Sequence, residues 1–163
     1  TSNKALVAKH GAELLSIAKE KNINFLFEAS VGGGIPIIRP LQSSLNPDEI
    51  LEISGILNGT TNYILTKMAR EGQTFEEALK KAQELGYAER NPEADVEGYD
   101  TCRKITILTS LATGKEVNYE DVPRASQRLP IPISNMRQSW EPRLNCLEPA
   151  AWKAIKPASM YAR

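Results

Sequence analysis

Residues 48–70, DEILEISGILNGTTNYILTKMAR, contain the pattern that decides the predicted fold class. The first part, residues 48–57, holds three isoleucines in a run that alternates enough to predict a β-strand. Asn58 is a favourable N-cap residue, and it predicts a helix that runs to about Arg70 and is closed by Gly72. The segment therefore predicts a strand followed by a helix.

The segments on either side show the same two kinds of pattern. Apolar stripes and capping residues predict three further helices, over residues 5–20, 75–85 and about 99–114. The short aromatic-rich segment 23–28 precedes a glycine run and predicts a second strand, whereas the polar segment 90–98 predicts a loop. We therefore predict an α/β (α+β) fold class, in which helices cover a mixed β-sheet.

The composition is that of an ordinary globular chain. Its 163 residues include 20 basic and 20 acidic side chains, and 41% of the residues are apolar. A net charge of zero lacks the basic footprint of a nucleic-acid-binding protein, and the apolar runs are far too short to span a bilayer. Two cysteines and one histidine offer neither a zinc cluster nor a disulfide framework. We expect a cytoplasmic protein that binds a small molecule and neither nucleic acid nor a membrane.

The composition changes between Val122 and Pro123. The last 41 residues contain six of the ten prolines, both tryptophans and no glycine, with seven basic and two acidic side chains. We therefore predict two dissimilar parts, residues 1–122 and residues 123–163. The chain also starts at Thr1 without an initiator methionine or a signal segment, so we expect it to be an internal piece of a longer protein.

The glycine run within residues 31–36, VGGGIP, matches neither nucleotide motif. Ile37 stands where G-x-G-x-x-G needs its third glycine, and the lysine of a P-loop is absent. Two interpretations remain open, namely a loop whose backbone lies close to a ligand, and a tight turn without one. Pro36 and Pro40 suit either a loop or the first turn of a short helix.

Asp100 and Lys104 are four residues apart on a predicted helix. The pair is either a solvated ion pair or a lysine that a carboxylate orients toward a substrate oxygen, and the spacing alone does not decide between them. His10 has no partner at metal-ligand spacing, and Cys102 is best explained as a small buried residue. We assign no chemical role to His10 or Cys102.

Five blocks of sequence, taken together and in order, resemble homoserine dehydrogenase. They are TSNKAL at 1–6, FEASVGGGIPII at 27–38, GILNGTTNYIL at 55–65, ELGYAE at 84–89 and DVEGYDTCRK at 95–104. The resemblance covers residues 1 to about 122, which correspond to the catalytic and dimerisation region of that family. It implies a homodimeric enzyme for the NAD(P)-dependent interconversion of L-homoserine and L-aspartate 4-semialdehyde, a step toward threonine, methionine and isoleucine.

The resemblance also implies roles for individual residues. Lys104 matches the catalytic lysine, and Lys4 matches a second lysine where nicotinamide and substrate meet. The positions that match substrate-binding residues are Glu89, Asp100, Asp95, Asn58, Gly59 and Thr60. Gly86 matches a position beside the NADP or NAD cofactor. The positions that match sodium contacts, mostly through backbone carbonyls, are Glu28, Val31, Gly33 and Ile35.

Two departures from the family pattern bear on activity. No G-x-G-x-x-G unit precedes Thr1, so we expect the isolated chain to be inactive. Back-translation of residues 123–141 in a neighbouring reading frame gives EGITKITDTDIKYAAELG, which fits the family, so we predict that 123–163 is a frame-shifted, disordered tail. The alternatives are a native basic tail, and for the whole chain a non-catalytic dimerisation remnant or interaction module. An aspartate-semialdehyde dehydrogenase would need an activated cysteine, and neither Cys102 nor Cys146 offers one.

Overall fold

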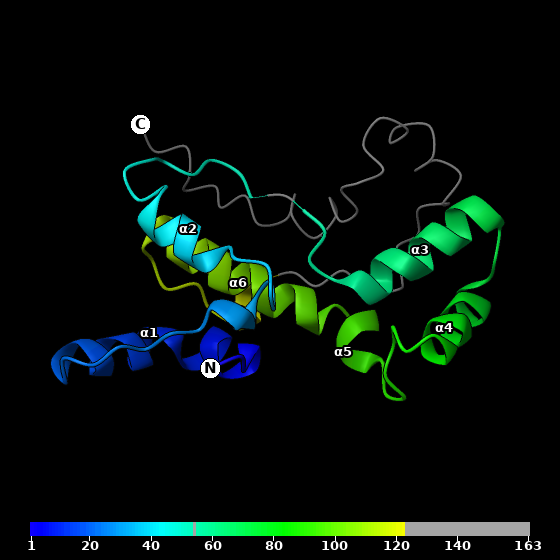
Figure 1. Cartoon of the computed structure of the whole chain (residues 1–163), viewed down its shortest axis with the longest axis horizontal. Helices are drawn as coiled ribbons and strands as arrows, with labels where there is room; N and C mark the ends of the chain where they lie inside the picture. The colour runs from blue at the N-terminus through cyan, green and yellow to red at the C-terminus, as the bar shows by residue number, and fades with distance from the viewer. Residues whose placement is uncertain (54, 123–163) are drawn as a thin grey trace. The chain divides into compact units, whose positions relative to one another are not determined.

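The computed structural model describes residues 1–53 and 55–122, and within them all regular secondary structure is helical (Figure 1). The chain divides into two compact units. The first unit comprises Thr1–Ile53 together with Thr101–Val122, and the second comprises Ser54–Asp100 within the part that the structure describes. The predictions made for residues 123–163 lie outside the described residues.

The first unit contains three α-helices and two 3-10 turns. Their bounds are α1 Lys4–Glu20, η1 Glu28–Ser30, α2 Ile38–Ser43, α6 Tyr99–Thr113, whose first two residues belong to the second unit, and η2 Tyr119–Asp121. The Asn3 side chain caps α1 by accepting a hydrogen bond from the N–H of Leu6, 3.1 Å away. The apolar residues that α6 buries include Cys102, Ile105, Ile107 and Leu108. This apolar helix provides much of the buried surface of the first unit.

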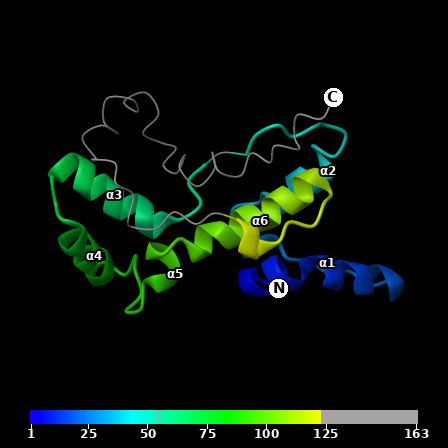
Figure 2. The same ribbon diagram turned by 180° about the vertical axis from the view of Figure 1, so that it is seen from behind.

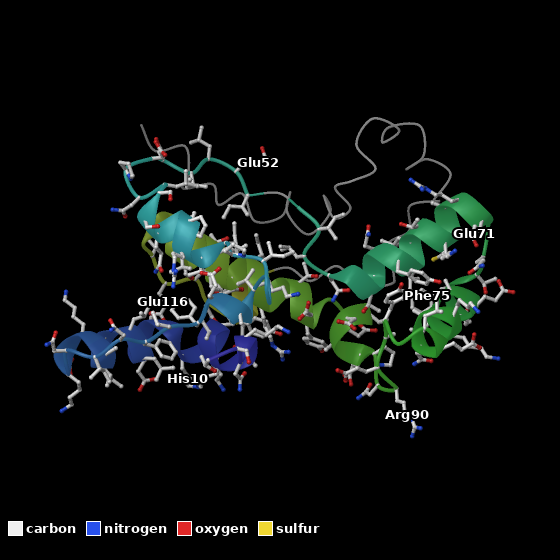
Figure 3. All side chains as sticks on the ribbon, viewed as in Figure 1. His10, Glu52, Glu71, Phe75, Arg90 and Glu116 are labelled. Atoms are coloured by element: carbon white, nitrogen blue, oxygen red, sulfur yellow. The ribbon has the colours of Figure 1, made fainter. Side chains whose placement is uncertain are left out.

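The second unit is built on a helical hairpin of α3 (Gly59–Glu71) and α4 (Phe75–Glu84), followed by the short α5 (Glu93–Val96). The two long helices lie side by side in Figures 1 and 2. Ile64 of α3 packs against Ala78 and Ala82 of α4, and partly buried side chains such as Phe75 surround them (Figure 3). The small alanines let the two helices approach closely around one large apolar side chain.

The prediction of a mixed β-sheet is wrong for the described residues, since neither expected strand forms there. The segment 23–28 bonds to α1, η1 and the N-terminus: the N–H of Ile23 donates to the carbonyl of Ala18, and the carbonyl of Phe27 accepts from the N–H of Ser30. The carbonyl of Leu26 accepts from the amino group of Thr1, at 2.6 Å. A strand needs a neighbouring chain segment to pair with its backbone. In the segment 48–57, the three isoleucines recur every third residue, so they would not share one face of a strand.

The predicted helices are confirmed. Asn58 caps α3, and Gly72 closes it in the left-handed conformation, with φ +68°. Thr74 and Glu77 form the predicted capping box of α4. The short helix α2 contains Pro40 in its first turn, as one of the two interpretations of Pro36 and Pro40 allowed. The segment 90–98, predicted to be a loop, contains the single helical turn α5.

Candidate functional site

Asn58 lies at the centre of a polar cluster in the second unit. Its side-chain Oδ1 accepts hydrogen bonds from the N–H of Thr61, at 2.8 Å, and from Thr61 Oγ1, at 2.9 Å. The same side chain donates from Nδ2 to Asp95 Oδ1, at 2.7 Å, and to Asp100 Oδ2, at 3.0 Å. One amide therefore caps α3 and binds two carboxylates that lie 37 and 42 residues further along the chain.

The two carboxylates differ in burial. Asp100 is 7% exposed, whereas Asp95 is half-buried on α5. Gly98 connects α5 to α6 with φ +75°, a conformation that favours glycine, and its N–H donates to the carbonyl of Asp95, at 3.1 Å. This turn brings the two acids, five residues apart, to the same amide.

The turn after α4 is attached to the start of α3. Thr60 Oγ1 donates to the backbone carbonyl of Tyr87, at 2.8 Å, and the rings of Tyr63 and Tyr87 lie 5.1 Å apart. Gly86 begins this turn with φ +77°, and a Cβ added there would meet nothing within 4 Å. Glu89, at the end of the turn, has an exposed side chain, and its carbonyl accepts from Gln83 at 3.0 Å.

The second unit thus contains every predicted substrate-binding residue and one of the two predicted cofactor residues. Gly59 is the first residue of α3 and is exposed, with open space where a Cβ would lie. The sequence interpretation did not single out Thr61 or Tyr87, which support Asn58 and Thr60. Both residues lie inside blocks of sequence that carry the family resemblance, and this resemblance is the signal that could have identified them.

The two predicted active-site lysines belong to the first unit, and both are half-buried. Lys4 is the first residue of α1. Lys104 lies on α6, four residues after Asp100, so that helical geometry places the two on one side of the helix. Arg103, the neighbour of Lys104, stacks on the ring of Tyr119, with 5.7 Å between the guanidinium and the ring centroid.

The glycine loop of the first unit is held by Glu28. Its carboxylate accepts hydrogen bonds from three successive N–H groups, those of Ile37 at 2.6 Å, Ile38 at 2.8 Å and Arg39 at 2.7 Å. Partial desolvation raises the pKa of Glu28, but these hydrogen bonds and the charge of Arg39 outweigh it, so the pKa lies below its ordinary value of 4.5. The Glu28 side chain is therefore committed to the start of α2.

The backbone of this loop is tightly curled. Gly33 has φ +61°, and the N–H of Ile35 donates to the carbonyl of Gly32, at 3.0 Å. A Cβ at Gly32 would clash with the carbonyl oxygen of Ile35, so only glycine fits there. Among the described residues, no group of three or more His, Cys, Asp or Glu side chains is placed to hold a metal ion. Any cation here would depend on backbone carbonyls.

A separate cavity of about 260 Å³ lies in the first unit, between α1 and α6. Its walls include the apolar side chains of Val7, Phe27 and Ile107, and Glu116, labelled in Figure 3, is also among the lining residues. None of the predicted site residues lines it.

Within residues 1–53 and 55–122, no helix is both long enough and apolar enough to cross a bilayer.

His10 and Cys102 lie in different environments within the first unit. His10 is exposed on α1 and lies 3.3 Å from Glu13, one turn further along the helix. Cys102 is 3% exposed and packs near the carbonyls of Tyr119 and Val122. The burial of Cys102 confirms the prediction of a small buried residue.

Comparison with known proteins gives a consistent result. The family model described as homoserine dehydrogenase matches residues 36–155, a range that extends past residue 122. The homoserine dehydrogenase of Synechocystis sp. is 54% identical over 122 residues, which are 75% of this chain and 28% of the relative. The homoserine dehydrogenase of Bacillus subtilis is 53% identical over 122 residues, which are again 75% of this chain and 28% of the relative. This chain therefore spans about 28% of the length of these relatives.

Solved structures of the same family resemble the chain in three dimensions. A homoserine dehydrogenase from Thiobacillus denitrificans has a TM-score of 0.78 and 41% identity, covering 85% of this chain and 32% of its own. A hyperthermophilic archaeal homoserine dehydrogenase in complex with NADPH has a TM-score of 0.74 and 36% identity, covering 82% of this chain and 41% of its own. At these identities, sequence and backbone geometry point to one family.

Proposed function

Because the chain belongs to the homoserine dehydrogenase family, we propose that it supplies the substrate-binding acids and the catalytic lysine of a longer homoserine dehydrogenase. The reaction is the NAD(P)-dependent interconversion of L-homoserine and L-aspartate 4-semialdehyde. The observation that carries this proposal is the hydrogen-bonded cluster in which Asn58 binds Asp95 and Asp100.

The acidic side chains of the second unit suit the α-ammonium group of the substrate. Asp95 and Asp100 are held together, and Glu89 lies on a turn that Thr60 attaches to the start of α3 through Tyr87. Hydrogen bonds between an ammonium and a carboxylate are among the stronger polar contacts in proteins. We assign Asp100, Asp95 and Glu89 to substrate binding, with Gly59 and Thr60 forming the adjacent turn.

Lys104 is proposed to move the proton of the reaction. In the direction of aldehyde reduction, the Lys104 Nζ donates a proton to the developing alkoxide oxygen, and in the reverse direction it accepts that proton. Lys104 follows Asp100 by one turn of α6, and this position supports the role. Residues four apart are neighbours on one face of a helix, so the helix keeps the lysine near an acid that is proposed to bind the substrate.

The nicotinamide cofactor, NADP or NAD, supplies the hydride chemistry when bound. The two residues proposed to contact the cofactor have the size and the charge that suit it. Gly86 leaves open space at an exposed turn, as a close approach to a planar ring requires, and Lys4 is a cation at the start of α1. The relative that was solved with NADPH supports a cofactor of this class.

A monovalent cation such as sodium fits the glycine loop only through its backbone. The Glu28 carboxylate is occupied by three N–H donors, so its side chain does not suit a cation ligand. The curled loop offers the carbonyl groups of Val31, Gly33 and Ile35, an oxygen donor set that suits a hard cation. We also propose a homodimeric, cytoplasmic enzyme on the route to threonine, methionine and isoleucine.

The test is a graft of residues 1–122 in place of the matching segment of the Bacillus subtilis relative, assayed for homoserine-dependent reduction of NADP. Lys104→Ala should lower turnover by about 1,000-fold or more with a smaller change in homoserine affinity, because its charge acts mainly as the alkoxide develops. Lys115→Ala, at an exposed lysine of the same unit, is the matched control. Near-normal turnover of the Lys104 variant would remove this lysine from the mechanism.

A further inference from the structure

We propose that Asn58 is a positioning residue, which holds the carboxylates of Asp95 and Asp100 side by side for the cationic group of the substrate; this rests on the proposed function. The family resemblance placed Asn58 only on the substrate side of the site. The hydrogen bonds assign it a different task, because all the polar atoms of its side chain are used within the protein.

The orientation of the Asn58 amide is determined by its neighbours. The oxygen faces the N–H of Thr61, a donor, and the nitrogen faces two carboxylates, which are acceptors. A flipped amide would place its oxygen against both carboxylates and its N–H groups against a backbone N–H, and would lose all these bonds. The N-cap of α3 therefore fixes the direction in which the two N–H donors point.

A neutral amide is suited to this task. Two carboxylates at one site repel each other, and this repulsion favours moving them apart or protonating one of them. Asn58 donates one N–H to each acid and adds no positive charge of its own. A lysine or arginine at the same place would also bridge the acids, but it would cancel charge that the substrate needs.

Burial indicates from which side the cationic group approaches. Asn58 and Asp100 are each 7% exposed, whereas Asp95 is only half-buried. A ligand therefore reaches the pair at Asp95, while Asp100 contributes from the buried side. The ligand class that fits is a small primary ammonium compound, such as the α-ammonium of L-homoserine.

Asn58→Ser tests the proposal, because serine can still cap α3 but cannot reach both carboxylates with two donors. In the Bacillus subtilis graft, we expect the KM for homoserine to rise about tenfold while kcat changes less than threefold and the KM for NADP stays the same. Asn58→Asp, which keeps the cap and removes both donors, is the second variant and should show a larger rise. Thr74→Ala, which removes the cap of α4 in the same unit, is the control for general destabilisation.

A double-variant comparison separates positioning from a structural role. If Asn58 acts through Asp95, the effect of Asn58→Ser on the KM for homoserine should be clearly smaller in an Asp95→Asn background than in the wild type. A purely structural role predicts the same factor in both backgrounds. Equal factors, or a KM no higher than that of Thr74→Ala, would overturn the proposal.

A second measurement on the 163-residue chain does not depend on activity. The side-chain carboxyl carbons of Asp95 and Asp100 should both change their NMR chemical shifts in Asn58→Ser and keep them in Thr74→Ala. Unchanged shifts in both Asn58 variants would refute the positioning role even if the graft is active. A wild-type graft without homoserine-dependent turnover, together with changed shifts, would contradict the proposed function and leave the positioning role standing.

Discussion

Two regions of this chain solve the problem of holding carboxylates in opposite ways. In the second unit, one neutral amide with two N–H donors is shared by Asp95 and Asp100. In the first unit, three backbone N–H donors converge on the single carboxylate of Glu28. The first arrangement joins two acids from different helices through one side chain, whereas the second uses one carboxylate to hold the start of α2.

The comparison teaches that an acidic residue in a family motif is not by itself a ligand. Glu28 and Asp100 both lie in blocks that resemble homoserine dehydrogenase. The identity of the donors, which only the structure provides, shows that Glu28 holds the start of α2 and that Asp100 shares one amide with Asp95.

The strongest test of this comparison exchanges the two kinds of acid for amides in the active graft. Asp100→Asn should lower kcat/KM for homoserine by roughly 100-fold, because it removes a buried charge from the proposed ammonium site. Glu28→Gln should change kcat/KM by less than about threefold. Steady-state assays over a range of homoserine concentrations decide it, and a large kinetic loss in the Glu28 variant would break the distinction.

The second prediction concerns stability. Glu28→Gln should destabilise the 163-residue chain by roughly 1–2 kcal/mol, because it weakens the hydrogen bonds that Glu28 accepts from the N–H groups of Ile37, Ile38 and Arg39. These N–H groups lie at the start of α2, where a helix offers them no acceptor of its own. Urea unfolding followed by circular dichroism measures the difference. Glu49→Gln, at an exposed acid of the same unit, should be neutral. An equal loss in both variants would contradict a specific role for Glu28.

The smallest expected effect is a pH dependence that belongs to Glu28. Its pKa is lowered in the folded state, so its contribution to stability is complete above the ordinary value of 4.5 and is lost as the pH falls through the lower folded value. The difference in unfolding free energy between the wild type and Glu28→Gln should therefore shrink below about pH 4.5. A difference that grows on acidification would reverse the sign of this argument.

The helices could be predicted because their signals are local. Asn58 and Gly72 bound α3, and the side chains of Thr74 and Glu77 bond within four residues at the start of α4. Such bonds form between neighbours in the chain, so residue type and spacing are enough to identify them. The single helical turn α5 was missed because four residues provide no periodicity to recognise.

The predicted strands failed for a related reason. Ile23 and Phe27 would share one face of a strand, yet Phe27 is 5% exposed and Ile23 is 62% exposed. Alternation predicts which side chains share a face, but a strand exists only where a second segment supplies backbone partners. Among the described residues, the amino group of Thr1 donates to the carbonyl of Leu26, and no ladder of such bonds forms.

The sequence by itself determined the capped helices, the burial of Cys102 and the family to which the chain belongs. Only the tertiary structure decided that Asn58 binds Asp95 and Asp100, 37 and 42 residues away, and that Glu28 is occupied by the start of α2. The physical reason is the distance along the chain between the bonded residues. Caps are bonds between near neighbours in the chain, whereas the partners of a buried amide or carboxylate depend on how distant segments pack, which no local pattern specifies.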